Sequence, residues 1–169
     1  GRYAHLYRSE PPVQWISIDG PLKPQAYDLK QAKQSTAEDY LQNRKSYLEN
    51  KDVRILFAEL SQPMKYYFRN ADADEVLFVH YGEGCLETDF GPLNYEAGDY
   101  LIVPRGTVYR LLPQTKSQFL IIESFSEVRL PDKGMLGQHA LFDPAVLKSP
   151  EPVSTPMPRG RYELKIQRC

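Results

Sequence analysis

Short apolar runs separated by turn residues are the feature of this chain that most limits its fold. The runs lie between residues 53 and 124, and turns such as Gly82-Glu83-Gly84, Ala97-Gly98-Asp99 and Pro104-Arg105-Gly106 divide them. Short strands at such even spacing are typical of closed or double-sheet antiparallel folds. We therefore predict an all-β jelly-roll barrel with strands at Val53–Leu60, Lys65–Phe68, Glu75–Tyr81, Cys85–Thr88, Leu93–Tyr95, Tyr100–Val103, Val108–Leu112 and Phe119–Ser124.

The segments on either side of this region differ from it in pattern. Residues 1–52 carry several prolines and one strand-like run at Val13–Ile18, and we expect an N-terminal arm that packs on the barrel. Within the arm, a capping-box spacing followed by apolar residues at helical intervals predicts a short surface helix over Thr36–Leu48. The barrel itself is expected over residues 53–148.

Residues 149–169 form the third part of the chain. They begin as a proline-rich connector and end in a strand-like run at Tyr162–Ile166. Just before them, Asp143 as cap and Pro144 at the first helical position predict another short helix. Because the sequence stops directly after a strand, we expect a second domain to follow in a longer protein.

The bulk composition excludes several classes of function. Lysine and arginine number 21 and aspartate and glutamate number 22, so no net charge favours nucleic acid or an anionic membrane. No apolar run approaches the length of a membrane span, and the amino terminus lacks a secretory pattern. Cys85 and Cys169 make neither a disulfide framework nor a CxxC pattern. We expect a cytoplasmic protein with reduced thiols.

Glu75 and the turn Pro104-Arg105-Gly106 have the layout of a metal-binding barrel of the cupin type. Such a barrel holds a divalent ion by two closely spaced histidines, a carboxylate on the next strand, and a third histidine after a Pro-x-Gly turn. Alternate side chains of a strand point into the barrel, so neighbouring strands can supply ligands to one ion. Here Glu75 stands in the carboxylate position, but residues of the 68–71 region and Tyr109 hold the histidine positions.

The chain has three histidines, and their positions argue against a replacement metal site. His80 follows Glu75 by an odd number of residues on one strand, so the two side chains point to opposite faces. His5 lies in the arm and His139 in the loop after the barrel. We therefore predict neither metal ligands nor catalytic residues in this chain.

Glu75 is instead expected to be hydrogen-bonded or ion-paired near the barrel mouth, and we name Arg69, Lys65 and Arg110 as its candidate partners. Aromatic side chains at such positions are more often core or rim residues than a substrate cage. A pocket inside the barrel remains possible, and its candidate lining residues are Tyr66, Phe68, Glu75 and Tyr109.

Four groups of residues occur in an order that is more specific than any one of them. They are Phe68-Arg69-Asn70-Ala71-Asp72-Ala73-Asp74-Glu75, Thr88-Asp89-Phe90-Gly91, Pro104-Arg105-Gly106, and Leu130-Pro131-Asp132 with Gly134 and Gly137. This series resembles the amino-terminal barrel of the homogentisate 1,2-dioxygenase family, over about Trp15 to Arg168. The glycine- and asparagine-rich opening of that family is not found here, which leaves open a subgroup with a different aromatic substrate.

The resemblance implies a cupin-type double-stranded β-helix and a function for the parent protein. Members of the family use iron(II) and oxygen to open an aromatic ring in tyrosine and phenylalanine catabolism, and they form trimer-based assemblies. Their iron ligands and catalytic histidine belong to a second barrel, which these 169 residues do not contain. The resemblance therefore implies an inactive, metal-free amino-terminal domain that needs its second cupin domain and self-associates.

Two other functions stay open. The chain could be a stand-alone, non-catalytic cupin that binds a small molecule or assembles with a partner. It could also be a metal-free sugar isomerase or epimerase that uses Tyr109 and a histidine as acid and base. The absence of a histidine in phase with Glu75 argues against the isomerase.

Overall fold

The computed structural model divides the chain into two units, and the barrel belongs to the unit made of Lys33–Leu130 and Pro144–Cys169. Gly1–Ala32 and Pro131–Asp143 make the other unit. The residues that the structure describes are 6–11, 16–21, 23–24, 26, 28, 39–130, 143–153 and 160–168.

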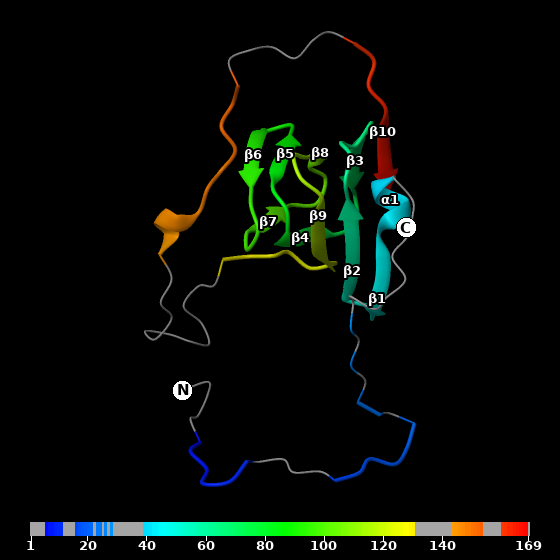
Figure 1. Cartoon of the computed structure of the whole chain (residues 1–169), viewed down its shortest axis with the longest axis vertical. Helices are drawn as coiled ribbons and strands as arrows, with labels where there is room; N and C mark the ends of the chain where they lie inside the picture. Colours follow the sequence, from blue (N-terminus) through cyan, green and yellow to red (C-terminus); the bar gives the residue numbers. More distant parts are fainter. Residues whose placement is uncertain are drawn as a thin grey trace. The chain divides into compact units, whose positions relative to one another are not determined.

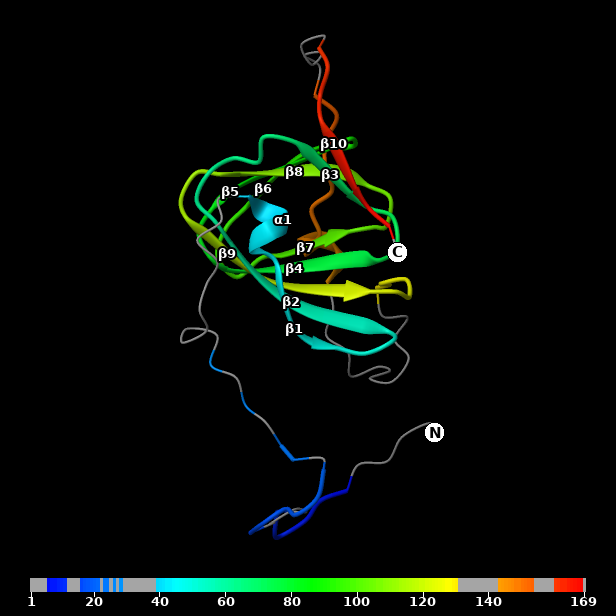
Figure 2. The same cartoon turned by 90° about the vertical axis from the view of Figure 1, so that its right-hand side faces the viewer.

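Two five-stranded sheets face each other and form the barrel (Figures 1 and 2). The first sheet is antiparallel and its order is β1 (Lys45–Glu49), β2 (Val53–Leu60), β9 (Ser117–Ser124), β4 (Asp74–Tyr81) and β7 (Tyr100–Val103). The order of the second sheet is β10 (Leu164–Gln167), β3 (Tyr67–Asn70), β8 (Val108–Pro113), β5 (Gly84–Thr88) and β6 (Gly91–Tyr95). In that sheet β10 runs parallel to β3, and the other pairs are antiparallel.

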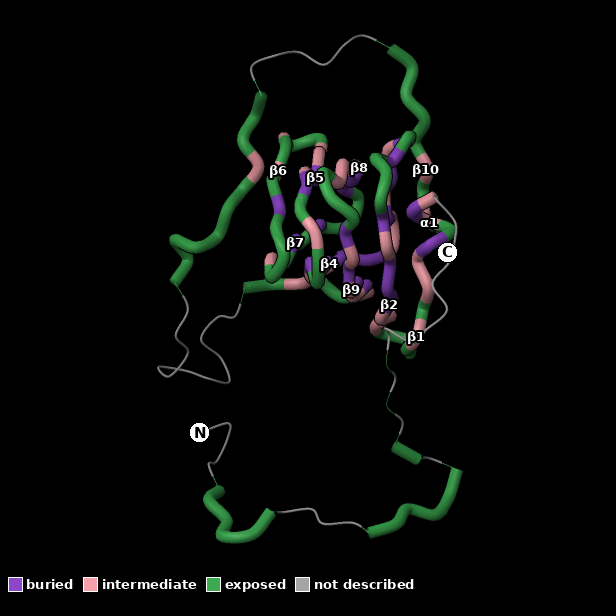
Figure 3. Tube along the Cα trace, in the orientation of Figure 1, coloured by how far each residue is buried: buried purple, intermediate pink, exposed green. Residues whose placement is uncertain are grey.

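Alternation along the strands places the core between the sheets. In β9 every second residue is buried, which directs Phe119, Ile121 and Glu123 inward. Figure 3 shows the buried residues gathered on the barrel strands. Apolar residues of both sheets meet there: Leu56, Ala58, Leu60, Phe68, Leu77, Val79, Leu86, Tyr95, Leu101, Val103, Tyr109, Leu111, Phe119 and Ile121 are all buried.

The strand predictions for the barrel are confirmed, with small changes at the ends. Two strands match in full, Val53–Leu60 and Tyr100–Val103, and most of the others differ by one or two residues. The largest shift is in β3, which begins at Tyr67 rather than Lys65. The predicted final strand is present as β10, and Pro144–Val146 forms a single 3-10 turn where a short helix was expected.

The predicted helix over Thr36–Leu48 is wrong after Asn43, and residues 36–38 lie outside the described residues. Of its described part, Tyr40–Asn43 alone is helical (α1), and its cap Asp39 accepts hydrogen bonds from the backbone N–H groups of Leu41 and Gln42. Arg44 is already extended, with φ −68° and ψ 109°. The next residues form β1 because they can pair with β2, so sheet pairing overrides the local helical spacing.

Both sheets take an edge strand from outside residues 53–148, since β1 lies in the expected arm and β10 in the expected connector. Of the predicted strand Val13–Ile18, the described part, Ile16–Ile18, has no regular structure, and residues 13–15 lie outside the described residues. Among the described residues, no helix has the length and apolarity to cross a membrane.

Candidate functional site

A buried guanidinium is the centre of the candidate site. Arg44 lies between α1 and β1, and only 4% of its side chain is exposed. Its Nη2 atom donates to Glu75 Oε1 and to Glu123 Oε1, each at 2.5 Å. Glu75 comes from β4 and Glu123 from β9, which are neighbours in the first sheet, and Cα pairing places the two residues opposite each other. Arg44 thus pairs with two inward-facing carboxylates, and Arg54 Nη1 lies 3.7 Å from the other oxygen of Glu123, Oε2.

Further polar side chains donate hydrogen bonds to these carboxylates, although Glu123 Oε2 accepts none from the described residues. Asn70 of β3 donates its Nδ2 to Glu123 Oε1 at 3.1 Å and to Glu75 Oε1 at 3.3 Å. The Tyr109 hydroxyl donates to Glu75 Oε2 at 2.7 Å. Gln167 of β10 donates to Glu123 Oε1 at 3.2 Å. Both sheets therefore contribute to one polar cluster, which we call the Arg44 cluster.

Aromatic rings enclose the guanidinium on its remaining sides. The Arg44 Cζ atom lies 5.4 Å from the Tyr40 ring centroid and 5.2 Å from that of Phe68. Phe68 packs edge-on against Tyr109, with centroids 5.5 Å apart. Contacts of a guanidinium with ring faces are favourable because of the ring quadrupole. The two rings hold Arg44 in place beside the carboxylates.

The electrostatics of the cluster set the charge states of its two tyrosines and of Arg44 at neutral pH. Burial, with Glu75 nearby, raises the pKa of Tyr109 well above its ordinary value. Burial also raises the pKa of Tyr40 to about 12. Burial disfavours the charged form of Arg44, but its oxygen neighbours, Glu75 and Glu123 among them, raise its pKa above the ordinary value. The tyrosines are therefore neutral hydrogen-bond donors, and the arginine stays charged.

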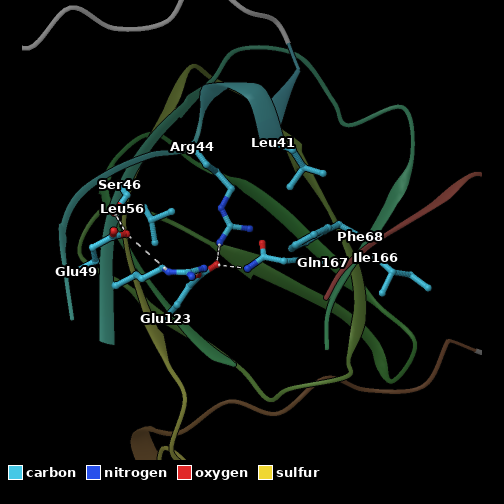
Figure 4. A pocket seen from close by; sticks show the side chains of 10 residues that line it. Leu41, Arg44, Ser46, Glu49, Leu56, Phe68, Glu123, Ile166 and Gln167 are labelled. Carbon is cyan, nitrogen blue, oxygen red and sulfur yellow. Dashed lines mark hydrogen bonds and ion pairs between the residues drawn. The ribbon is translucent and has the colours of Figure 1, made fainter. Parts of the chain in front are cut away.

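A cavity of about 350 Å³ opens beside the cluster, where β1 and β2 face β3 and β10 (Figure 4). Leu41, Leu56, Phe68 and Ile166 give it apolar walls. Its polar lining consists of Arg44, Ser46, Glu49, Arg54, Glu123 and Gln167. Figure 4 shows that Arg44 and Gln167 both reach Glu123 from different sides of this cavity.

The residues of the cluster do not fit an iron ion. Iron(II) centres of the two-histidine, one-carboxylate type need imidazole ligands and open coordination positions. Here the carboxylates of Glu75 and Glu123 already bind a fixed cation, and an amide and a phenol fill the neighbouring positions. Among the residues that the structure describes, no group of three His, Cys, Asp or Glu side chains is arranged to hold a metal.

The structure places the four predicted lining residues inside the barrel, but in different roles. Glu75 and Tyr109 are fully buried in the Arg44 cluster, and Phe68 lines the cavity. Tyr66 is buried next to α1, where its hydroxyl donates to Asp39 Oδ1 at 3.0 Å. That these residues hold a ligand stays a prediction.

The candidate partners of Glu75 were wrong, whereas its inward orientation was right. Arg69 and Arg110 each alternate with an inward-facing residue and so point outward, and Arg110 pairs with Glu87. Lys65 is exposed. The partner is Arg44, which the sequence assigned to a surface helix.

Glu123 was also missed. Its place in the alternation of Phe119–Ile121–Glu123 was the one signal that could have identified it as a second inward carboxylate.

The orientation of His80 is confirmed. It is exposed on β4 while Glu75 on the same strand is fully buried, so the two side chains lie on opposite faces. His5 and His139 lie outside the described residues.

Comparison with known proteins agrees with this geometry. The model of the family "Homogentisate 1,2-dioxygenase N-terminal" matches residues 6–160. A relative from Saccharolobus solfataricus, named a putative dioxygenase, is 30% identical over 183 residues that include 99% of this chain and 47% of that protein. The chain thus spans about half the length of this curated relative.

Solved structures extend the likeness to the fold. A protein from Neisseria meningitidis is 18% identical, with a TM-score of 0.50 over 59% of this chain and 99% of that chain. A cupin-2 domain protein from Shewanella frigidimarina is 20% identical, with a TM-score of 0.44 over 48% of this chain and 78% of that chain. The two facing sheets and the family match together make the fold cupin-type. The chain belongs to the homogentisate 1,2-dioxygenase N-terminal family.

Proposed function

We propose that this chain is the amino-terminal, non-metal-binding cupin half of a longer ring-cleaving dioxygenase, the parent protein. In this proposal, iron(II), oxygen and the aromatic substrate bind to a second barrel outside these 169 residues. The family match and the half-length alignment with the Saccharolobus relative support an enzyme of this kind. The observation that carries the metal-free role is the position of Arg44 between Glu75 and Glu123.

Electrostatics explains why this position matters. A divalent ion that bound Glu75 would have to displace a guanidinium held by two carboxylates at 2.5 Å and enclosed by two aromatic rings. If Arg44 stayed, two like-signed cations would share one pocket, which is costly at low effective dielectric. Together, Arg44 and the more distant Arg54 supply two positive charges for the two carboxylates, and they need no cofactor.

The same contacts support a scaffolding role for the cluster. Arg44 precedes the edge strand β1 and bonds the carboxylates on β4 and β9 of the same sheet. Those carboxylates in turn accept hydrogen bonds from side chains on β3, β8 and β10 of the other sheet. Charge-assisted hydrogen bonds are shorter and stronger than neutral ones. The cluster therefore ties both sheets together at one end of the barrel.

The test compares the 169-residue chain with the parent protein after anaerobic loading with iron(II). We expect oxygen uptake on homogentisate, or on a related dihydroxyphenyl acid, from the parent alone, and no stoichiometric iron in the shorter chain. Iron bound to the shorter chain, and lost in its Glu75→Gln variant, would refute the metal-free role.

A stand-alone binding module is the second candidate, and the cavity beside Arg44 favours it. About 350 Å³ with apolar walls and a polar floor is within the size range of small-molecule sites. The discriminating measurement is the intact mass of the native protein: a mass of 19.5 kDa supports the module, and about twice that mass supports the parent enzyme. We also propose that the parent is cytoplasmic and that it self-associates. Light scattering on the purified protein checks the self-association.

A further inference from the structure

Two neighbouring rows of residues on the outer face of the first sheet are apolar, although sheets of this kind usually alternate between an apolar and a polar face. The row beyond them is polar, since Gln118 donates to Glu59 there. In β9, Leu120 and Ile122 alternate with the core residues and point outward. In β4, Val76 and Phe78 do the same. These strands are apolar on both faces, which is the pattern of a sheet covered on both sides.

Strand register assembles these residues into two rows. The first row crosses all five strands and the second crosses four of them, because directly paired residues point to the same side. The first row is Leu48, Ile55, Ile122, Val76 and Ile102, and the second is Phe57, Leu120, Phe78 and Tyr100. We call these nine residues the outer apolar face.

The edges of this face are well exposed. Tyr100 is 65% exposed, Ile102 46% and Leu48 48%, whereas Phe57 is buried and the other members are half-buried. The second sheet differs, since Glu87 and Arg110 form an ion pair in the middle of its outer side and the Tyr67 hydroxyl donates to Glu87. Only the first sheet therefore presents a continuous apolar outer surface among the described residues.

We propose that the outer apolar face is the docking surface for the remaining half of the parent protein. This inference rests on the proposed function, since it requires a parent about twice as long as this chain. The occupant is a covalently linked domain with an apolar face of its own.

The path of the chain supports this occupant. The Gln167 carbonyl accepts a hydrogen bond from Ala71 N–H, in the connection between β3 and β4. Chain that continues past β10 therefore leaves the barrel beside the first residues of β4. Val76 and Phe78 point outward from the same strand.

Surface area argues against a second copy as the occupant. Five strands about 4.8 Å apart, with two rows of side chains about 6.8 Å apart, cover on the order of 300 Å². A standard interface between free proteins buries about 800 Å² on each partner. A linked domain needs less area, because the linker raises its effective concentration. The outer apolar face is thus large enough for a tethered domain and small for free association.

Hydroxyl-radical footprinting of the 169-residue chain and of the parent tests the proposal, with oxygen uptake measured on the same parent sample. Oxidation of Tyr100 should fall about fivefold in the parent, as expected when a side chain that is 65% exposed enters a packed interface. Phe90, which is 62% exposed in the turn between β5 and β6 of the opposite sheet, is the control and should not change. In the parent, Tyr100→Lys should restore oxidation of Phe78, whereas Phe90→Lys should not.

Equal oxidation of Tyr100 in the two proteins, in a parent that consumes oxygen, overturns the docking surface and leaves the proposed function standing. A parent without dioxygenase activity counts against the proposed function, while loss of Tyr100 oxidation in it still supports the docking surface. If Tyr100 is already protected from oxidation in the 169-residue chain, another occupant covers the face and the proposal is overturned. This holds whether or not the protection depends on protein concentration. A native protein that ends at Cys169 overturns both.

Discussion

Replacement of Arg44 by methionine is the perturbation that the buried cluster makes most informative. Methionine fills similar space without charge, so Glu75 and Glu123, whose side chains are 0% and 1% exposed, lose their shared cation. Their Oε1 atoms lie no more than about 5 Å apart, because both bond one nitrogen at 2.5 Å, and at an effective dielectric of about 20 their repulsion is about 3 kcal/mol. Removing one partner of a buried ion pair costs about 3–5 kcal/mol. We therefore expect Arg44→Met to lower the free energy of unfolding by about 3–5 kcal/mol.

The assay is equilibrium urea unfolding at pH 7.5 followed by far-UV circular dichroism. The matched control is Arg129→Met, because Arg129 also pairs with a glutamate, Glu127, but its side chain is 76% exposed. We expect no measurable change in that variant. The triple variant Arg44→Met, Glu75→Gln, Glu123→Gln should recover most of the lost stability, since it removes the uncompensated charges along with the cation. A cost below about 1 kcal/mol for Arg44→Met, or no recovery in the triple variant, would refute this reasoning.

Three further perturbations follow from the same structure. Burial raises the pKa of Tyr40 to about 12, so as the pH rises this tyrosine loses its proton in the unfolded state before it does in the folded state. The free energy of unfolding should therefore fall above pH 10 by about 1.4 kcal/mol per pH unit for this group. Urea unfolding at pH 9, 10 and 11 should show a smaller fall of stability with pH in Tyr40→Phe. Gly91→Ala should cost more than Gly98→Ala in thermal unfolding, because both glycines have positive φ but an added Cβ at Gly91 would clash with the Glu151 carbonyl oxygen; equal costs would count against that close approach. Asp39→Ala should destabilise the chain by about 1 kcal/mol through loss of the α1 cap, and Asp39→Asn should recover part of that loss.

The barrel could be predicted from the sequence because its strands are specified locally. Alternation and turn residues located β2 and β7 to the residue and placed Glu75 on the inner face. The region before the barrel was harder. The residues of β1 have helical spacing, but they are held as a strand by pairing with β2, a tertiary contact that no local pattern reveals.

The Arg44 cluster could not be derived from local sequence for a related reason. Arg44 lies 31 residues from Glu75 and 79 from Glu123, and the chain has 21 lysines and arginines that could have compensated two inward carboxylates. The strand alternation places Glu75 and Glu123 at inward positions, although only Glu75 was predicted there, and buried charges require a partner. The inward carboxylates therefore indicate that a cation is needed, while the fold decides which lysine or arginine supplies it.

The central claim is that a guanidinium of the chain, rather than a metal ion, balances the carboxylates inside this barrel. Anaerobic titration of the purified 169-residue chain with iron(II), read as tightly bound metal after desalting, tests it most directly. We expect no stoichiometric iron in the wild-type chain and no difference between wild type and Glu75→Gln. Stoichiometric iron that disappears in Glu75→Gln would contradict it.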